Sequence, residues 1–334
     1  MLGILRVEDP HQRYAAVRLC SDLPLRRREF HRDDGGWVLP LPRVQLARLE
    51  YQLELARHDG TTEVVCDPGN PRRAPGAFGE KSEWWAPGYR LPDWIRAEPA
   101  DATFERVEIR VLGRTLDIRI SSPDEGALPL LVAHDGPEYD NLASLTYYAR
   151  AMIERGALPP FRVALLPPGE RDEWYSASAV YGRSLCHRIL PALNATVPVT
   201  GRPVGMGASL GALAMLQAQR TWPGTFAGLF MQSGSFFIPR FDRHESGLPR
   251  YGRIVRFVRG VLQSRATPEP VPAMMTCGAE EENLHNNRVM ASALAAQGYD
   301  VRMHEVPDLH NYTSWRDAFD PYLTRLLSGL WPAS

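Results

Sequence analysis

Apolar positions are spaced differently in the first hundred residues and in the rest of the chain. Before about residue 100, short apolar stretches such as 44–55 and 62–66 are interrupted by turn-forming clusters, among them Asp67-Pro68-Gly69-Asn70-Pro71. Short strands separated by such turns are typical of a small sandwich of two sheets. We therefore predict an N-terminal β-sandwich over residues 1–100.

From residue 101 to 334, strand-like apolar runs alternate with longer segments of helical periodicity. Alternation on this scale predicts a mainly parallel sheet covered by helices, which is an α/β fold. A strand hairpin around Gly113 precedes the alternating part. The predicted strands are residues 128–133, 161–166, 202–206, 227–232, 273–277 and 299–306, and the predicted helices are residues 142–155, 177–193, 210–220, 254–263, 284–297 and 313–327.

One motif at a predicted strand-to-helix junction carries candidate chemistry. Gly207-Ala208-Ser209-Leu210-Gly211 has the form G-x-S-x-G, between the strand at 202–206 and the helix at 210–220. In α/β hydrolases this context is a nucleophile elbow, in which a strained turn exposes the serine hydroxyl. The N–H of the following residue then faces the developing oxyanion. Ser209 is the predicted nucleophile, and Leu210 is a predicted oxyanion-hole donor.

A hydrolase of this kind needs an acid and a histidine after the serine, each at the end of a strand. His310 follows the strand at 299–306 and directly precedes the last helix, so it is the predicted base. The acid is expected in the loop after the strand at 273–277, where Glu280, Glu281 and Glu282 are consecutive. One of the three would orient His310. The alternative is that the three glutamates are the acidic start of the next helix. Both can be true, with one glutamate catalytic and the other two exposed.

Bulk properties exclude several other classes of protein. A net charge of -1 over 334 residues provides no general attraction to nucleic acid or to anionic membranes. The N-terminus does not resemble a signal peptide, and no apolar run is long enough to span a bilayer. The four cysteines lack metal-ligand spacing, so we expect free thiols, no zinc site and a cytoplasmic location.

Several motifs in order along the chain resemble the enterochelin (ferric-enterobactin) esterases, within the esterase-D and mycolyltransferase group of α/β hydrolases. The motifs that carry the resemblance are Arg48-Leu49-Glu50-Tyr51-Gln52-Leu53, Asp67-Pro68-Gly69-Asn70-Pro71, Phe78-Gly79-Glu80-Lys81-Ser82, His134-Asp135-Gly136, Gly207-Ala208-Ser209-Leu210-Gly211, Gln232-Ser233-Gly234-Ser235-Phe236, Asn287-Arg288, and His310-Asn311 leading to Ser314-Trp315-Arg316. The resemblance implies an α/β-hydrolase domain at 101–334 behind an Ig-like (E-set) sandwich at 1–100 that forms part of the substrate entrance. It also implies cytoplasmic hydrolysis of catecholate siderophore trilactones.

Carried over residue by residue, the resemblance makes Ser209 the nucleophile and His310 the base, and its register favours Glu281 as the acid. Arg171 and Trp315 are candidates for substrate binding. In the family the region of Arg171 helps to bind an anionic catecholate complex, but here Arg171-Asp172-Glu173-Trp174-Tyr175 replaces the usual Arg-x-x-Glu-Leu pattern. Arg240, in the stretch 238–244 after a strand, is a further candidate for substrate binding, with a polar surface loop as the alternative.

The chain departs from the family pattern at Pro137, where the second oxyanion donor is usual. Proline has no N–H, so we expect the donor to be Glu138 or Tyr139.

The sequence thus predicts a serine esterase that needs no metal or organic cofactor and acts on a small-molecule ester. The resemblance implies that this ester is a siderophore trilactone or a related lactone. One alternative is an esterase or acyltransferase for another ester, such as an acylated sugar or macrolactone. An alternative of another class is a catalytically inactive ligand-binding protein, against which the intact serine, acid and histidine set argues. The oligomeric state is left open.

Overall fold

The computed structural model describes residues 3–332, which divide by internal packing into two compact units. One unit holds the chain up to Arg90 together with Gly278–Glu281 and Val306–Ser314. The other holds Leu91–Cys277, Glu282–Glu305 and the chain from Trp315 onward. The N-terminal strands therefore belong to the same unit as two short segments from the last quarter of the chain.

The first unit contains two antiparallel sheets that share one core. The three-stranded sheet has the order β1-β4-β3, and the other has the order β2-β5-β8-β7 with β6 paired to β5. Leu5, Leu39, Leu19 and Leu53 come from both sheets and are buried in one cluster. The Ig-like assignment and the domain boundary at residue 100 stay predictions. The strands are β1 (Gly3–Glu8), β2 (Tyr14–Cys20), β3 (His31–Asp33), β4 (Gly36–Leu41), β5 (Arg48–Arg57), β6 (Thr62–Val65), β7 (Arg73–Ala74) and β8 (Lys81–Trp85).

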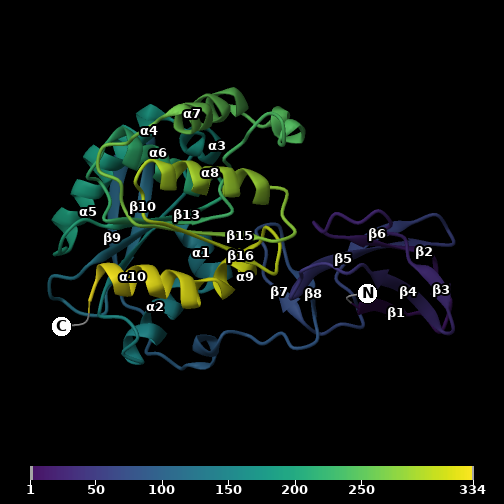
Figure 1. Ribbon diagram of the computed structural model, residues 1–334. Coiled ribbons are helices and arrows are strands. Elements are labelled where there is room, and N and C mark those ends of the chain that lie inside the picture. The colour runs from purple at the N-terminus through teal and green to yellow at the C-terminus, as the bar shows by residue number, and fades with distance from the viewer. Residues whose placement is uncertain (1–2, 333–334) are drawn as a thin grey trace. The chain divides into compact units, whose positions relative to one another are not determined.

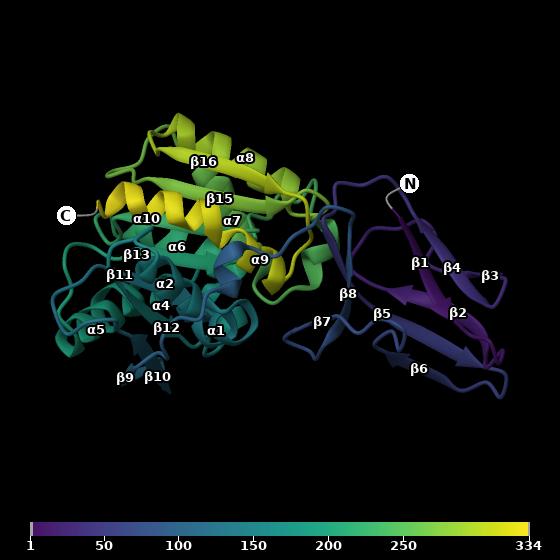
Figure 2. The same cartoon turned by 90° about the horizontal axis from the view of Figure 1, so that it is seen from below.

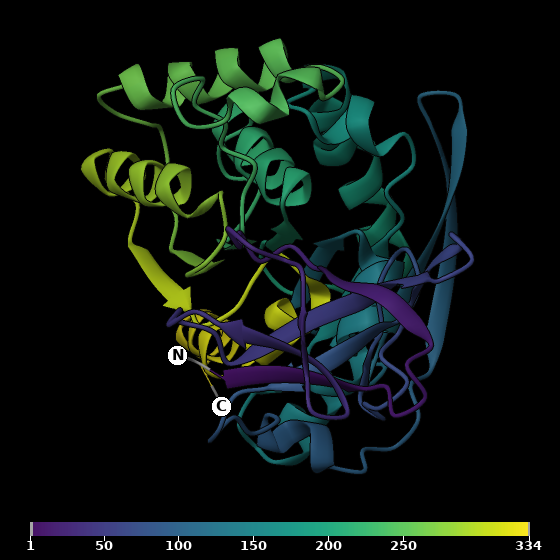
Figure 3. The ribbon, with the colours of Figure 1, turned by 90° about the vertical axis from the view of Figure 1, so that its right-hand side faces the viewer.

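The second unit is built on an eight-stranded sheet with the order β16-β15-β14-β13-β11-β12-β10-β9. The pairs from β12 through β11, β13 and β14 to β15 are parallel, whereas β9, β10 and β12 pair antiparallel. Figure 2 shows β9 and β10 at one edge and β16 at the other, and the β9–β10 hairpin is the long blue ribbon at the right of Figure 3. The predicted mainly parallel sheet and its hairpin are confirmed. The strands are β9 (Phe104–Val111), β10 (Arg114–Ser121), β11 (Leu130–His134), β12 (Arg162–Leu166), β13 (Val204–Ala208), β14 (Gly228–Gln232), β15 (Ala273–Gly278) and β16 (Val301–Val306).

Helices cover both faces of this sheet, with α4, α6, α7 and α8 on one side and α2 and α10 on the other (Figure 1). The α-helices are α1 (Gly136–Ala143), α2 (Leu145–Glu154), α3 (Arg171–Tyr175), α4 (Ala179–Ser184), α5 (Leu190–Thr196), α6 (Leu210–Thr221), α7 (Tyr251–Gln263), α8 (Leu284–Ala296), α9 (Tyr312–Asp317) and α10 (Thr324–Leu330). Shorter helical segments are η1 (Asp93–Arg96), η2 (Leu185–Ile189), η3 (Arg243–Gly247) and η4 (Phe319–Leu323). Among residues 3–332, no helix has the length and apolar character that crossing a bilayer requires.

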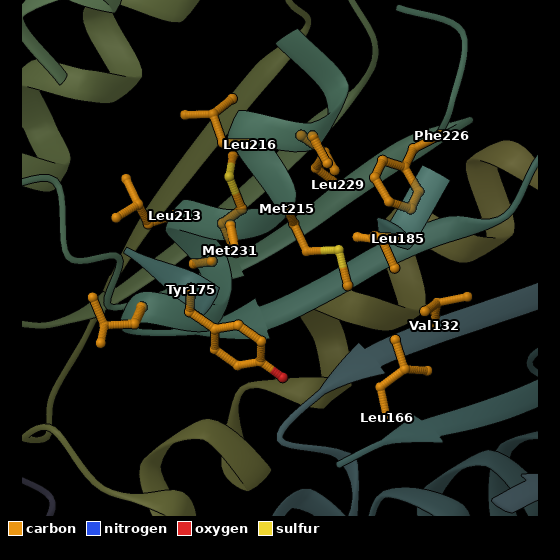
Figure 4. Packing of buried hydrophobic residues seen from close by; sticks show 14 of the residues in the cluster. Val132, Leu166, Tyr175, Leu185, Leu213, Met215, Leu216, Phe226, Leu229 and Met231 are labelled. Atoms are coloured by element: carbon orange, nitrogen blue, oxygen red, sulfur yellow. The ribbon is translucent and has the colours of Figure 1, made fainter. Parts of the chain in front are cut away.

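The largest buried cluster lies between the sheet and α6. Figure 4 shows Leu213, Met215 and Leu216 of α6 among side chains of the neighbouring strands, such as Leu229 and Met231. All five are fully shielded from solvent. Burial of apolar area on this scale is the main force that holds the helix against the strands. The start of α6, and with it Ser209, is therefore fixed by the core of the eight-stranded sheet.

Candidate functional site

Ser209 lies where β13 ends and α6 begins, as predicted. Its backbone, with φ of 54° and ψ of −123°, is in a strained region that residues with side chains rarely occupy. A Cβ atom at Gly207 would lie 2.5 Å from the backbone carbon of Gly211, so the tight turn requires glycine there. The Ser209 side chain is at the start of the helix and is partly exposed. This is the geometry of a nucleophile elbow.

A second serine, Ser235, lies against Ser209, the predicted nucleophile. Its Oγ is 3.0 Å from the Oγ of Ser209, and its backbone N–H donates to the Ser209 carbonyl at 3.1 Å. Asn287 fixes the backbone of Gly234, the residue before Ser235. Its Nδ2 donates to the Gly234 carbonyl at 2.8 Å, and its Oδ1 accepts from the Gly234 N–H at 3.0 Å. Sequence reasoning assigned Ser235 no role, although its place directly after β14, the neighbour of β13, is a signal that could have identified it.

His134 supports the elbow from inside the protein. Its Nδ1 lies 3.1 Å from the Gly211 carbonyl and its Nε2 lies 2.8 Å from the Tyr181 hydroxyl. The carbonyl can only accept, so Nδ1 carries the proton and Nε2 accepts from the tyrosine. Complete burial lowers the pKa of His134 to about 3, so the ring is neutral at physiological pH. His134 is therefore a fixed support and not a proton carrier.

Glu281 and His310, the predicted acid and base, form a hydrogen-bonded pair in the unit that contains the N-terminal sheets. Glu281 follows β15 and His310 follows β16, and Glu281 Oε2 lies 2.9 Å from His310 Nδ1. The other carboxylate oxygen accepts the Gly278 N–H at 2.7 Å. The Glu281 side chain is 1% exposed and that of His310 is 35% exposed. The carboxylate oxygen can only accept, so Nδ1 carries the proton and Nε2 is the ring nitrogen that can act as a base.

The two flanking glutamates have other partners. Glu280 accepts the backbone N–H of Gln45 at 2.8 Å, and Glu282 lies 2.9 Å from His244 Nε2. With Glu245, the residues His244 and Glu282 are the one group in residues 3–332 whose donor atoms could converge on a metal ion. Both ends of the His244–Glu282 pair are largely exposed. The geometry thus favours Glu281 among the three candidates for the acid.

The turn after β11 contains the expected second oxyanion donor. Asp135 has a left-handed backbone with φ of 50°, and α1 begins directly after it. The Tyr139 N–H already donates to the Asp135 carbonyl at 2.9 Å, so the expectation that Tyr139 could be the donor is not supported. Glu138 and Leu210 are in the first turns of α1 and α6, where N–H groups have no partner within the helix. Their N–H groups are therefore the better candidates, while Pro137 has none.

Arg171 stabilises the same turn. Its Nε and Nη2 approach the Asp135 carboxylate at 3.0 and 2.9 Å, in a two-pronged ion pair. Burial raises the pKa of Asp135, and the guanidinium opposes this shift. The Arg171 side chain remains 35% exposed, and its predicted contact with substrate stays a prediction.

The other two predicted substrate contacts differ from each other. Trp315 is 6% exposed, its Nε1 donates to Ser233 Oγ at 3.0 Å, and its carbonyl accepts from Gln232. The indole supports the end of β14 behind the elbow, and a contact of Trp315 with substrate stays a prediction. Arg240 is exposed beside the Phe241 ring, at 4.4 Å from its centroid, and stays a candidate.

Comparison with known families agrees with this geometry. The Esterase family model, described as "Putative esterase", matches residues 109–326. The chain belongs to the esterase family. The match covers the eight-stranded sheet from within β9 through β16, together with Ser209, Glu281 and His310.

Individual proteins that are similar to this chain are also esterases. The chain is 27% identical over 221 residues to an iron(III) enterobactin esterase of Dickeya dadantii, a match that spans 62% of this chain and 50% of the relative. The chain thus spans about half the length of the curated relatives it matches. A ferric enterobactin esterase structure from Salmonella typhimurium superposes with a TM-score of 0.78 at 19% identity, over 98% of this chain and 93% of that one. An enterobactin esterase from Shigella flexneri gives 0.77 at 18% identity, over 98% and 92%. These structural similarities show the fold.

Proposed function

We propose that this protein is a serine esterase with Ser209 as nucleophile, His310 as base and Glu281 as the acid that orients the base. The observation that carries the proposal is the Glu281–His310 bond of 2.9 Å, in a chain whose Ser209 has the backbone of an elbow. The strands β13, β15 and β16 belong to one sheet, and the loop or turn after each contains one member of the proposed triad.

In the proposed reaction, His310 Nε2 takes the hydroxyl proton as Ser209 Oγ forms a bond to the ester carbonyl carbon. The carbonyl oxygen becomes an oxyanion, stabilised by the N–H groups of Leu210 and Glu138. The imidazolium then gives its proton to the leaving alkoxide as the C–O bond breaks. A water molecule releases the acyl group by the same sequence of steps and restores the Ser209 hydroxyl. Throughout, Glu281 stabilises the positive charge on His310.

The proposed substrate class is a catecholate siderophore trilactone or a related lactone. It is supported by the names of the curated relatives and by the family-like motifs of the N-terminal part. We further propose that residues 1–100 form an Ig-like sandwich at the substrate entrance. We also propose a cytoplasmic location, supported by the four free cysteines, since a reducing compartment keeps thiols unpaired.

A hydrolysis screen tests both the reaction and the substrate class. Enterobactin with and without iron(III), a simple aryl ester and an acylated sugar are incubated with the wild-type chain and with Ser209→Ala. We expect the wild type to hydrolyse the aryl ester and to cleave enterobactin with the higher kcat/KM. Hydrolysis of the aryl ester alone would keep the esterase and overturn the siderophore substrate. No hydrolysis of any ester would favour the inactive binding protein.

A further inference from the structure

The loops that carry Glu281 and His310 are held by the N-terminal sheets. The segments Gly278–Glu281 and Val306–Ser314 fall in the same compact unit as β1 to β8. The Ala47 N–H donates to the Pro307 carbonyl at 2.6 Å, and Leu309, the neighbour of His310, is 3% exposed within the core of the two sheets. Backbone and side chain of this loop are thus anchored on both sides of Asp308.

One buried arginine is at the centre of this contact. Arg48, the first residue of β5, is 0% exposed. Its Nη1 donates to Glu83 of β8 at 2.6 Å, and its Nη2 donates to Asp308 at 2.6 Å. Nη1 also reaches Thr313 Oγ1 at 2.5 Å, and Thr313 in turn donates to Glu50 of β5. One guanidinium therefore joins two strands of the sandwich to both sides of His310.

Asp308 links Arg48 to the loop that contains His310. Its Oδ2 accepts from Arg48, while its Oδ1 accepts the Leu309 N–H at 2.8 Å and the Asn311 side-chain amide at 3.3 Å. Both carboxylate oxygens are therefore used as acceptors, one toward the sandwich and one within the loop that contains His310. A planar guanidinium has a fixed fork of donors, so it restricts the orientation as well as the position of its partner.

We propose that Arg48 and Asp308 are a positioning pair through which the N-terminal sheets hold His310 against Glu281. The inference rests on the proposed roles of these two residues. If the pair positions His310, the N-terminal sheets contribute to catalysis on every substrate, small or large. This contribution is separate from their proposed role at the substrate entrance. Loss of the pair should let the imidazole move, and a displacement of about 1 Å in a catalytic group costs about 10²-fold in rate.

Two isosteric substitutions in the full-length chain separate positioning from mere stability. Each of Asp308 and Glu83 accepts a 2.6 Å bond from Arg48, and each is buried. Asp308→Asn leaves one acceptor oxygen for two directions, so it must lose either the Arg48 bond or the Leu309 bond. Glu83→Gln keeps an acceptor oxygen for Arg48 and does not alter the His310 loop, so it serves as the matched control.

Aryl-ester hydrolysis is measured at a temperature at which circular dichroism shows that all variants are folded. We expect Asp308→Asn to lower kcat by about 10- to 100-fold with KM changed by no more than about twofold. The kcat of Glu83→Gln should stay within about threefold of wild type. Equal effects of the two substitutions on kcat would overturn the proposal. If Asp308→Asn does not fold, Thr313→Val replaces it and should lower kcat likewise, with Thr313→Ser, which keeps the hydroxyl, restoring it.

A second readout is independent of turnover. Hydrogen exchange of the His310 Nδ1 proton, followed by NMR, reports how firmly the ring is held on Glu281. Exchange should be faster in Asp308→Asn than in wild type and unchanged in Glu83→Gln, and equal rates in all three would contradict the inference. If the wild type hydrolyses no ester, the proposed function fails, and this exchange rate still decides whether the pair positions His310.

Discussion

Replacement of Glu281 by glutamine separates the proposed acid from its two neighbours. Glutamine has nearly the same shape, and its oxygen can still accept the Gly278 N–H, which Glu281 accepts at 2.7 Å. Its amide nitrogen would then face the His310 Nδ1 across the 2.9 Å gap, donor against donor. The imidazole must break this contact or move its proton to Nε2, and in both cases Nε2 is a poorer acceptor for the Ser209 proton.

The expected size of the effect follows from this change of tautomer. In the well-studied serine protease triad, the equivalent loss lowers kcat about 10⁴-fold. Because Glu281 is almost completely buried, little water is available to replace the lost acceptor. We expect kcat to fall about 10³- to 10⁴-fold, which is about 4–5.5 kcal/mol at about 1.36 kcal/mol per tenfold.

The assay is initial-rate hydrolysis of an aryl ester by Glu281→Gln, with Glu280→Gln and Glu282→Gln as matched controls. Both controls remove a carboxylate of the same loop whose observed partners are Gln45 and His244, so their kcat should stay within about threefold of wild type. A Glu281→Gln enzyme with more than about one tenth of wild-type kcat would refute the role of the acid. A loss as large in Glu280→Gln would place the acid elsewhere in the loop.

Three further predictions concern the elbow and its support. Ser235→Ala should lower kcat about 10-fold and leave KM nearly unchanged, because the Ser209 hydroxyl loses its partner at 3.0 Å; an unchanged rate constant for phosphonylation of Ser209 would contradict this. Gly207→Ala should lower the free energy of unfolding by about 1–3 kcal/mol in denaturant titrations, because the new Cβ would lie 2.5 Å from the Gly211 backbone, and full stability would disprove the required close approach. Burial lowers the pKa of His134 in the folded state from 6.5 to about 3, so the unfolded chain binds the extra proton first and stability falls as pH decreases below about 6.5. Between pH 7 and pH 5 this should cost about 2 kcal/mol in wild type and much less in His134→Asn, and equal pH slopes would show that His134 is not the cause.

The elbow could be predicted from sequence because all of its determinants are local. A strand, a G-x-S-x-G turn and a helix follow one another within 18 residues, and the structure has Ser209 at that junction. The proposed acid was harder to predict, because Glu280, Glu281 and Glu282 are adjacent and the sequence does not show which side chain points toward His310. Contact with His310, 29 positions away, distinguishes Glu281 and depends on where β15 and β16 end.

Other features depend on contacts that the local pattern does not contain. Arg48 and Asp308 are 260 positions apart, and nothing in the alternation of β5 indicates that its first residue is a fully buried arginine. The predicted helix at 142–155 begins earlier, since Pro137 is tolerated in a first turn, and Ser144 with φ of 56° divides it into α1 and α2. Likewise, the helix expected at 313–327 is divided into α9, η4 and α10, with non-helical backbone at Asp320.

Covalent labelling of Ser209, the proposed nucleophile, tests the central claim most directly. The wild-type chain and Ser209→Ala are incubated with a serine-directed fluorophosphonate, and intact-protein and peptide mass spectrometry locate the adduct. We predict one adduct per wild-type chain, on Ser209, with loss of esterase activity in step with labelling, and no adduct on folded Ser209→Ala. Labelling of both proteins to the same extent, or an unlabelled wild type that still hydrolyses esters, would contradict the proposed mechanism.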